Sequence, residues 1–167
     1  MKKLENNQTG FTLIEILVVI GMIAILATIV LIAINPARQF AQGRNSQRTS
    51  NVNAILNAIG QNMADNKGVF TCTAVGAVLD ATPRTIEYTA AAAAGKTDLR
   101  PCLVPTYISE LPFDPSFNSS AGHATSATDY DTEYTVTKDT TTGRVTVCAP
   151  GGVEPAISGS TAICVTR

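Results

Sequence analysis

Hydrophobic residues form one continuous block near the N-terminus, and a polar, irregular remainder follows it. The 24 residues from Phe11 to Ile34 (FTLIEILVVIGMIAILATIVLIAI) carry a single charge, on Glu15. At about 1.5 Å of rise per residue, a helix of this length reaches roughly 36 Å and spans a hydrocarbon core of about 30 Å. The block exceeds the apolar part of an ordinary secretory signal, and no A-x-A cleavage site follows it. We therefore expect residues 11–34 to cross a membrane as a helix.

Glu15 is the one ionisable residue inside this block. Sixteen of the 24 residues are Leu, Ile, Val or Phe. On insertion scales their contributions sum to about −7 kcal/mol, against about 3 kcal/mol for one carboxylate. Insertion is therefore favourable despite the charge. The carboxylate either reaches the lipid headgroups near the helix end or serves a function that needs a positively charged partner.

Beyond Pro36 the pattern becomes that of an amphipathic helix. Five apolar residues recur at helical spacing among Asn, Gln, Arg and Ser, namely Val52, Ile55, Leu56, Ile59 and Met63. We expect residues 35–68 to continue the helix, with this stripe packed on the rest of the protein. Pro36 lacks an amide donor, so a kink is expected near Ile32–Pro36. Lys67 and Gly68 supply a basic last turn and a glycine at which the helix ends.

Three arginines, Arg38, Arg44 and Arg48, follow the apolar block on this helix. They fit a solvated face and, equally, contacts with acidic groups of a neighbouring molecule. The sequence leaves both interpretations open.

The remaining 99 residues, 69–167, suffice for one small domain that buries the helix stripe. Alternating patterns predict strands at Thr85–Thr89, Thr132–Thr137, Arg144–Cys148 and Ala162–Thr166. A turn that needs positive φ at Gly143 joins the middle two strands, and a short helix is expected within Pro101–Glu110. The predicted fold is α+β, with the long helix packed on a small antiparallel sheet of three or four strands.

All four cysteines (Cys72, Cys102, Cys148 and Cys164) lie after the membrane segment. An even count in an oxidising compartment indicates two disulfides, for which three connectivities exist. We favour Cys72–Cys102 and Cys148–Cys164, because each would staple a loop-rich segment. Zinc sites use closely spaced cysteine pairs, which do not occur here.

Charge and composition argue against two large classes of function. The chain has 12 Lys and Arg against 13 Asp and Glu, and 5% of its residues are aromatic. A nucleic-acid-binding protein needs an excess of basic residues to neutralise phosphates and aromatic residues to stack on bases. These values therefore argue against binding of nucleic acid. The single histidine, His123, lies in a loop-like stretch, and no nucleotide-binding or nucleophile-elbow motif occurs. We therefore expect neither enzymatic activity nor a cofactor.

The N-terminal residues resemble a known family. The run Gly10-Phe11-Thr12-Leu13-Ile14-Glu15, behind a short basic leader and ahead of the apolar block, is similar to the class III signal of type IV pilins and pseudopilins. The resemblance implies that residues 1–10 are a leader. Prepilin peptidase would cut between Gly10 and Phe11 and methylate the new amine. It also implies that Glu15 pairs with the Phe11 amine of a neighbouring subunit in a filament.

The same resemblance implies partners and a location. The precursor would sit in the cytoplasmic membrane, and an assembly ATPase and an inner-membrane platform protein would polymerise it into a cell-surface filament with other copies of itself. One alternative is a pseudopilin of a type II secretion system. Another is a binding module on a permanent membrane anchor that never polymerises.

Three acidic residues are candidates for a calcium site. Asp129, Asp131 and Glu133 alternate along a predicted strand entry, and such oxygen ligands suit Ca²⁺. Some major pseudopilins bind calcium in their C-terminal loops, and the run Leu111–Pro115 (LPFDP) is similar to the motif before such a loop. A solvated acidic face is the alternative.

Overall fold

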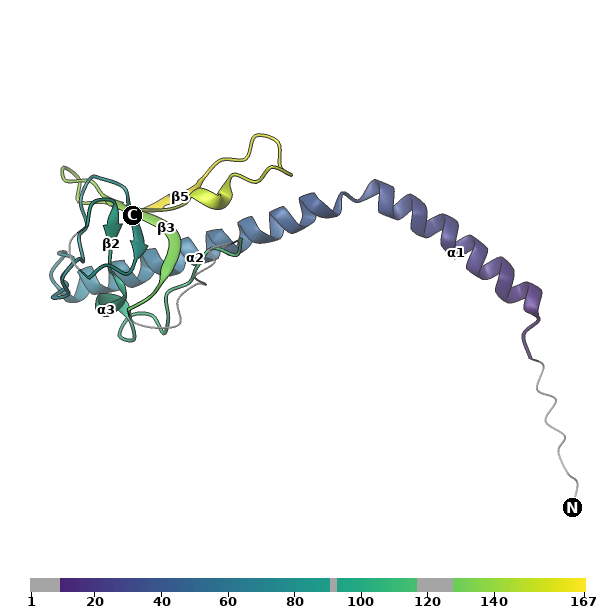
Figure 1. Cartoon of the computed structure of the whole chain (residues 1–167), viewed down its shortest axis with the longest axis horizontal. Coiled ribbons are helices and arrows are strands. Elements are labelled where there is room, and N and C mark those ends of the chain that lie inside the picture. The colour runs from purple at the N-terminus through teal and green to yellow at the C-terminus, as the bar shows by residue number, and fades with distance from the viewer. Residues whose placement is uncertain (1–9, 91–92, 117–127) are drawn as a thin grey trace, which may run out of the picture. The chain divides into compact units, whose positions relative to one another are not determined.

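A computed structural model provides the structure of the chain and describes residues 10–90, 93–116 and 128–167 (Figure 1). The chain divides into two compact units, with the boundary between Ala37 and Arg38. In chain order the elements are α1 (Leu13–Ala33), α2 (Pro36–Asp65), β1 (Arg84–Glu87), β2 (Lys96–Thr97), α3 (Arg100–Leu103), β3 (Asp131–Lys138), β4 (Val145–Ala149), the 3₁₀ turn η1 (Pro150–Gly152) and β5 (Ile163–Thr166).

The helix of the apolar block is interrupted before the amphipathic helix begins. Ile34 has an extended backbone, with φ −99° and ψ 113°, and its N–H donates to the carbonyl of Val30. A proline disfavours helical conformation in the residue before it, and its own fixed φ suits the first turn of a new helix. Helical structure therefore resumes at Pro36. The interruption predicted near Ile32–Pro36 is confirmed.

The C-terminal end of α2 is closed by residues with left-handed backbone. Lys67 and Gly68 have φ values of 57° and 87°, and the N–H of Gly68 donates to the carbonyl of Met63 at 2.8 Å. This geometry caps the last carbonyls of a helix and favours glycine, which has no Cβ to clash. The last residues of the predicted helical segment thus form its cap.

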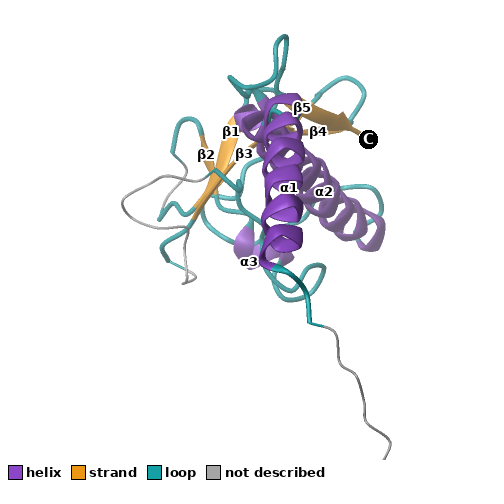
Figure 2. Cartoon of the chain, turned by 90° about the vertical axis from the view of Figure 1, so that its right-hand side faces the viewer, coloured by secondary structure: helices purple, strands orange, loops and turns teal. Residues whose placement is uncertain are grey.

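The strands form one mixed sheet in the order β2-β1-β3-β4-β5 (Figure 2). All four predicted strands are present, and their contacts with one another are antiparallel. Gly143 has a φ of 71° between β3 and β4, as predicted. The expectation of a wholly antiparallel sheet is wrong, because β2 pairs in parallel with β1. A strand of two residues is too short to show an alternating pattern in the sequence.

The core lies between α2 and the sheet, as the apolar stripe predicts. Val52, Ile55 and Ile59 of α2 are almost completely buried, together with Tyr134 of β3 and Val147 of β4. Burying side chains of this size is worth about 1.5–3 kcal/mol each. The hydrophobic effect therefore holds α2 and the sheet together.

The short helix expected within residues 101–110 has only one turn. α3 ends at Leu103, and Val104 has an extended backbone with φ −98° and ψ 133°. Pro105 follows Val104 and disfavours a helical conformation there. The proline inside the predicted segment thus explains the early end.

Two disulfides join the cysteines in the favoured pairing, Cys72–Cys102 and Cys148–Cys164. The first ties the segment after α2 to α3. The second joins directly opposite residues of β4 and β5, with a Cα–Cα distance of 4.1 Å. The loop-stapling reason given for the second bond is therefore wrong, because it crosses two paired strands.

Candidate functional site

The expected cleavage site precedes α1 in an exposed, irregular stretch. Gly10 is exposed, and the side chain of Phe11 is 85% exposed. A Cβ atom added at Gly10 would meet nothing within 4 Å, so this chain's own fold does not require glycine there. Any requirement for glycine at this position comes from a molecule that binds the segment, such as a peptidase.

Glu15 is bound by the residue that begins its own helix. Its Oε2 accepts hydrogen bonds from the backbone N–H and the hydroxyl of Thr12, both at 2.8 Å. In return the N–H of Glu15 donates to the Thr12 hydroxyl at 3.3 Å. This capping box satisfies N–H groups that have no partner within the first turn. It also places the negative charge at the helix N-terminus, where the helix dipole stabilises it.

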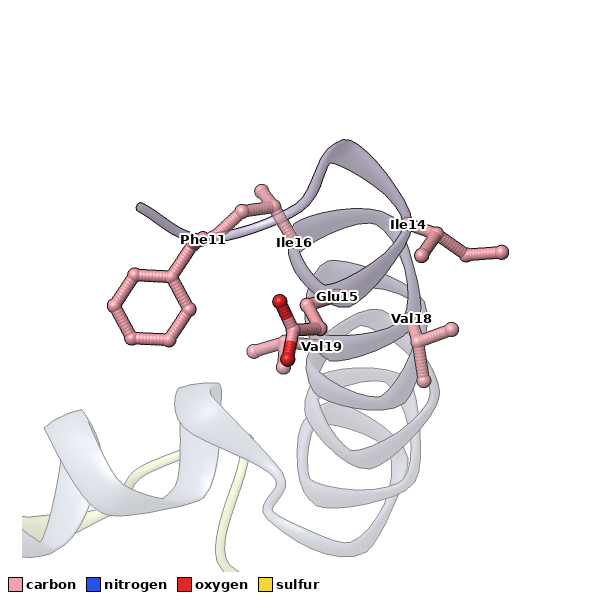
Figure 3. Close-up of a pocket in the computed structure, with 6 residues that line it drawn as sticks. All are labelled: Phe11, Ile14, Glu15, Ile16, Val18 and Val19. Atoms are coloured by element: carbon pink, nitrogen blue, oxygen red, sulfur yellow. The ribbon is translucent and has the colours of Figure 1, made fainter. Parts of the chain in front are cut away.

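The Phe11 ring and the Glu15 carboxylate lie on the same side of the helix (Figure 3). Val19 lies one turn after Glu15 on this side, whereas Ile14 and Val18 lie on the other side of the same turns. The side chains on both sides border an open apolar hollow at the start of α1. The only charge at this hollow is thus a carboxylate, among the residues described around it.

The surface of α1 is apolar throughout its length. The large apolar side chains from Phe11 to Leu31 are between 46% and 85% exposed. Leu13–Leu31 is long and apolar enough to cross a membrane. An apolar surface of this extent is not stable in water. It must be covered by lipid, by other protein, or by each in turn.

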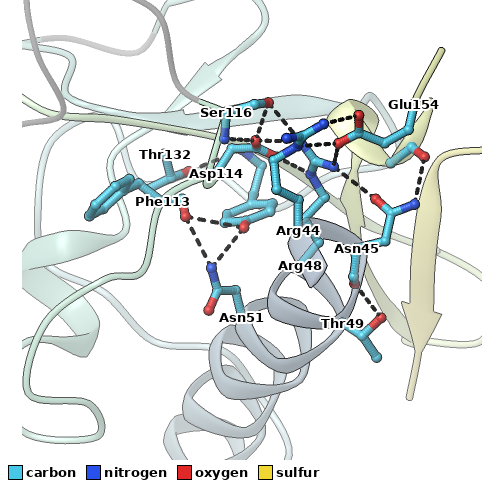
Figure 4. A network of polar contacts seen from close by, with 12 residues as sticks. Arg44, Asn45, Arg48, Thr49, Asn51, Phe113, Asp114, Ser116, Thr132 and Glu154 are labelled. Carbon is cyan, nitrogen blue, oxygen red and sulfur yellow. Dashed lines mark hydrogen bonds and ion pairs between the residues drawn. The ribbon is translucent and has the colours of Figure 1, made fainter. Parts of the chain in front are cut away.

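A second polar site lies inside the globular unit, where Arg48 of α2 is completely buried. Its guanidinium donates to both oxygens of Asp114, from Nε at 2.7 Å and from Nη2 at 2.8 Å. Nη1 donates to the carboxylate of Glu154. Ser116 and Asn45 complete the surroundings, accepting at 2.6 Å and 2.8 Å. Figure 4 shows this cluster at the α2 surface.

The cluster is balanced in charge by a second arginine. Arg44 forms two hydrogen bonds with Glu154, at 2.7 Å and 2.6 Å. Together with the contact from Arg48, they lower the pKa of Glu154 to about 2. Burial by itself raises the pKa of Asp114, but the hydrogen bonds from Arg48 and Ser116 outweigh it and hold that pKa below its ordinary value. Both carboxylates are therefore ionised, and two positive charges face two negative ones.

For two of the three arginines, Arg44 and Arg48, these contacts correct both interpretations. Arg44 and Arg48 neither form a solvated face nor wait for a neighbouring molecule, because they bind acidic groups of their own chain. Asp114 is 66 residues from Arg48 and Glu154 is 106 residues from it. No local pattern predicts such pairs. The capping box, in contrast, could be read from Thr12 and Glu15, which are three residues apart before an apolar run.

The calcium candidates do not converge on one point. Among the described residues, no group of three or more His, Cys, Asp or Glu side chains is arranged to hold a metal ion. Asp131 instead accepts from the N–H of Glu133 at 2.8 Å, where β3 bulges and Glu133 has a φ of 59°. Asp129 is exposed. Asp114, in the motif that resembles a calcium-loop entry, is already bound by Arg48. His123 lies outside the described residues.

Comparison with known proteins identifies the N-terminal segment. A family model described as the prokaryotic N-terminal methylation motif matches residues 6–31. No curated protein and no solved structure is significantly similar to the chain. The matched segment contains Gly10 and Phe11, the capping box and most of α1. Residues 6–31 are therefore the class III signal motif of type IV pilins and pseudopilins.

Proposed function

We propose that the chain is a structural subunit of a type IV pilus-like filament. Residues 1–10 are a leader, which prepilin peptidase removes between Gly10 and Phe11 before methylating the Phe11 amine. Residues 11–34 hold the precursor in the cytoplasmic membrane and then form the filament core. The helix from residue 35 and the domain at 69–167 remain outside.

The observation that carries this proposal is the methylation motif at residues 6–31. The motif includes most of α1, whose large apolar side chains are exposed. Moving such a helix from lipid into a bundle of helices exchanges one apolar medium for another. Hydrophobicity therefore supplies little drive for assembly. A polar contact that exists only in the filament supplies both drive and register.

Glu15 provides that contact in this proposal. In the single chain its carboxylate has hydrogen bonds from Thr12 but no cation from the described residues around it. The new amine of Phe11 on a neighbouring subunit supplies a positive charge, and the pair offsets the penalty of burying each charge. The partners of this step are other copies of the chain, the peptidase, an assembly ATPase and a platform protein.

Substitution of Glu15 separates its charge from its hydrogen bonds. Glu15→Gln keeps an oxygen that accepts from Thr12, so the capping box remains, but it removes the charge. We expect Glu15→Gln and Glu15→Leu to insert in the membrane at wild-type levels. Loss of about 1.4 kcal/mol per added subunit would raise the subunit concentration needed for assembly about tenfold, so we expect far fewer filaments. Sheared filaments are counted by immunoblot and electron microscopy.

Two control variants test the specificity of this effect. Thr12→Ala removes the capping hydroxyl and keeps the charge. Thr28→Val removes a hydroxyl that donates to the carbonyl of Ala24 within α1. We expect both variants to assemble. Normal filament yield in Glu15→Gln would refute the pairing and leave the capping box as the only role of Glu15.

The mature N-terminus distinguishes this function from its alternatives. A chain that begins with N-methylated Phe11 excludes a permanently anchored binding module. Gly10→Val should leave a precursor about ten residues too long, and because a side chain at position 10 meets nothing in this chain, misfolding would not explain the defect. An uncut Met1 terminus in the wild type contradicts the proposal. Short periplasmic assemblies without surface filaments would favour a secretion pseudopilin.

A further inference from the structure

Two large apolar side chains of the globular unit are exposed close to the N-terminal end of α2. Phe40, in the second turn of α2, is 70% exposed, and Val153, after η1, is 60% exposed. We propose that they form an apolar patch, the Phe40–Val153 patch, that rests in the lipid headgroup layer while the chain is in the membrane. Two side chains bury too little area to hold a domain on a bilayer by themselves. The patch therefore acts only in a chain that α1 already anchors.

The two residues belong to segments that contact each other. Glu154 follows Val153 directly in the chain, and its carboxylate accepts hydrogen bonds from Arg44 at 2.7 Å and 2.6 Å (Figure 4). Phe40 lies one turn before Arg44 on the same face of α2. Ala41, next to Phe40, is fully buried, so the chain packs closely on this turn. The loop that carries Val153 is thus held against the part of α2 that carries Phe40.

The covalent chain keeps Phe40 close to the membrane segment. Ile34 is the last residue of the apolar block, and Phe40 follows it six positions later. Two residues of extended chain and four of helix reach at most roughly 13 Å. The polar headgroup layer on each side of a bilayer is about 5–8 Å thick. Because the first distance is an upper limit, the ring of Phe40 can reach this layer.

The charges around the patch suit a surface that carries lipid phosphates. No acidic residue occurs from position 16 to position 64, whereas the same stretch contains three arginines. Glu154, beside Val153, is bound by Arg44 and Arg48. The two segments that carry the patch therefore present no unpaired carboxylate that would repel phosphates. Apolar side chains next to basic ones are typical of protein surfaces that bind at the lipid interface.

The test uses tryptophan as a reporter, because the chain contains none. Phe40→Trp and Val153→Trp place the reporter in the patch. Val75→Trp is the matched control, since Val75 is 71% exposed in the segment between α2 and β1. Met22→Trp places the reporter inside α1. Each full-length variant is reconstituted in vesicles of phosphatidylcholine and phosphatidylglycerol, with a large excess of lipid over chain.

Lipids brominated at different depths then locate each tryptophan, because bromine quenches its fluorescence on contact. We expect shallow bromines, near the ester groups, to quench Phe40→Trp and Val153→Trp more strongly than deep bromines do. Met22→Trp should show the reverse order. Val75→Trp should be quenched by acrylamide in the water and by neither lipid. Adding Phe40→Ser to Val153→Trp should weaken the shallow quenching, because the larger apolar side chain of the patch is removed.

This inference rests on the membrane location in the proposed function, but not on cleavage or on filament formation. Equal responses of Phe40→Trp and Val75→Trp would overturn it, because the patch would then face water. Protection of Phe40→Trp from acrylamide without quenching by bromine would also overturn it, since protein, such as a second copy, would then cover the patch.

The Met22→Trp variant separates the two failures. Deep quenching of this variant together with either of those results refutes the patch alone and leaves the proposed function standing. Absence of deep quenching in Met22→Trp would show that α1 is not in the bilayer. That result would refute the proposed function and this inference together.

Discussion

The two units of this chain differ in the exposure of their apolar side chains. In α1 the apolar side chains are exposed along the whole helix, and the one carboxylate is bound by its own Thr12. In the globular unit most large apolar side chains form a buried core between α2 and the sheet, although a few, such as Phe40 and Val75, are exposed. No buried side-chain N or O atom of the described residues lacks a hydrogen-bond partner. The first unit therefore has an apolar surface without cover among the described residues, whereas the second has a core of its own.

This difference concerns two charged side chains, Glu15 in the first unit and Arg48 in the second. In the proposed function Glu15 gains a cation from a neighbouring subunit, so its contacts would change on assembly. Arg48 meets its acidic partners in its own chain and buries them almost completely. In the proposed filament the globular domain would keep its internal contacts while the helix moves from lipid into the filament core.

The largest expected effect comes from separating the units. A chain that begins at Arg38 should fold alone, because the core and both disulfides lie beyond that residue. We expect its unfolding temperature to stay within about 4 °C of the full-length value, which is about 1 kcal/mol. Membrane sedimentation should be lost completely. Near-UV circular dichroism and flotation assays measure the two effects. Loss of tertiary signal in the truncated chain would show that the globular unit depends on α1.

Asp114→Ala tests the closure of the globular unit. It leaves the buried guanidinium of Arg48 without its two-point partner, so we expect a loss of about 3–5 kcal/mol in the free energy of unfolding. Chemical denaturation followed by tyrosine circular dichroism measures it. Asp129→Ala is the control, because Asp129 is exposed and should cost less than about 0.5 kcal/mol. Equal effects of the two substitutions would contradict the role given to the cluster.

Removal of one disulfide should have a somewhat smaller effect. Cys148→Ala/Cys164→Ala opens a loop with a sequence separation of 16, for which loop entropy predicts a loss of about 3 kcal/mol. Cys72→Ala/Cys102→Ala, with a separation of 30, should cost about 0.5 kcal/mol more. Denaturation of both variants gives the order. The reverse order would show that pairing of β4 and β5 depends on its disulfide.

The smallest effect is a change in pH dependence. Burial raises the pKa of Asp98, despite a hydrogen bond from the hydroxyl of Tyr130 at 2.8 Å. The fold therefore favours the protonated form, and its contribution is lost as pH rises from about 4 through the raised pKa. Asp98→Asn keeps the acceptor and removes the titration. We expect the variant to gain stability relative to wild type at pH 7, but not at pH 3.

The two carboxylates bound by Arg44 and Arg48 make stability depend on pH in the opposite direction. The pKa values of Asp114 and Glu154 are lowered, that of Glu154 to about 2. Their stabilisation is therefore present above pH 4 and is lost between about pH 4 and pH 2. Thermal unfolding between pH 2 and pH 8 should show a loss of stability at both ends of this range in the wild type. In Asp98→Asn the loss at rising pH should be smaller but not absent, because burial also raises the pKa of Glu133. An undiminished loss at rising pH in the variant would contradict the assignment to Asp98.

Features that depend on neighbouring residues could be predicted from the sequence. The apolar block, the interruption at Pro36, the stripe on α2, the glycine turn at Gly143 and the four longer strands all follow from periodicity or from the backbone chemistry of proline and glycine. The methylation motif is also local, since it lies within the continuous stretch of residues 6–31. Even the capping box of Thr12 and Glu15 can be read from a spacing of three residues.

Contacts between distant segments were decided only by the tertiary structure. The parallel strand β2, the buried partners of Arg48 and the cross-strand position of the Cys148–Cys164 bond depend on which segments the core brings together. The physical reason is that a side chain's local pattern encodes its preference for water or for the interior, but not the identity of the group it meets there. Charged side chains pair only with groups that the burial of apolar residues has brought close to them.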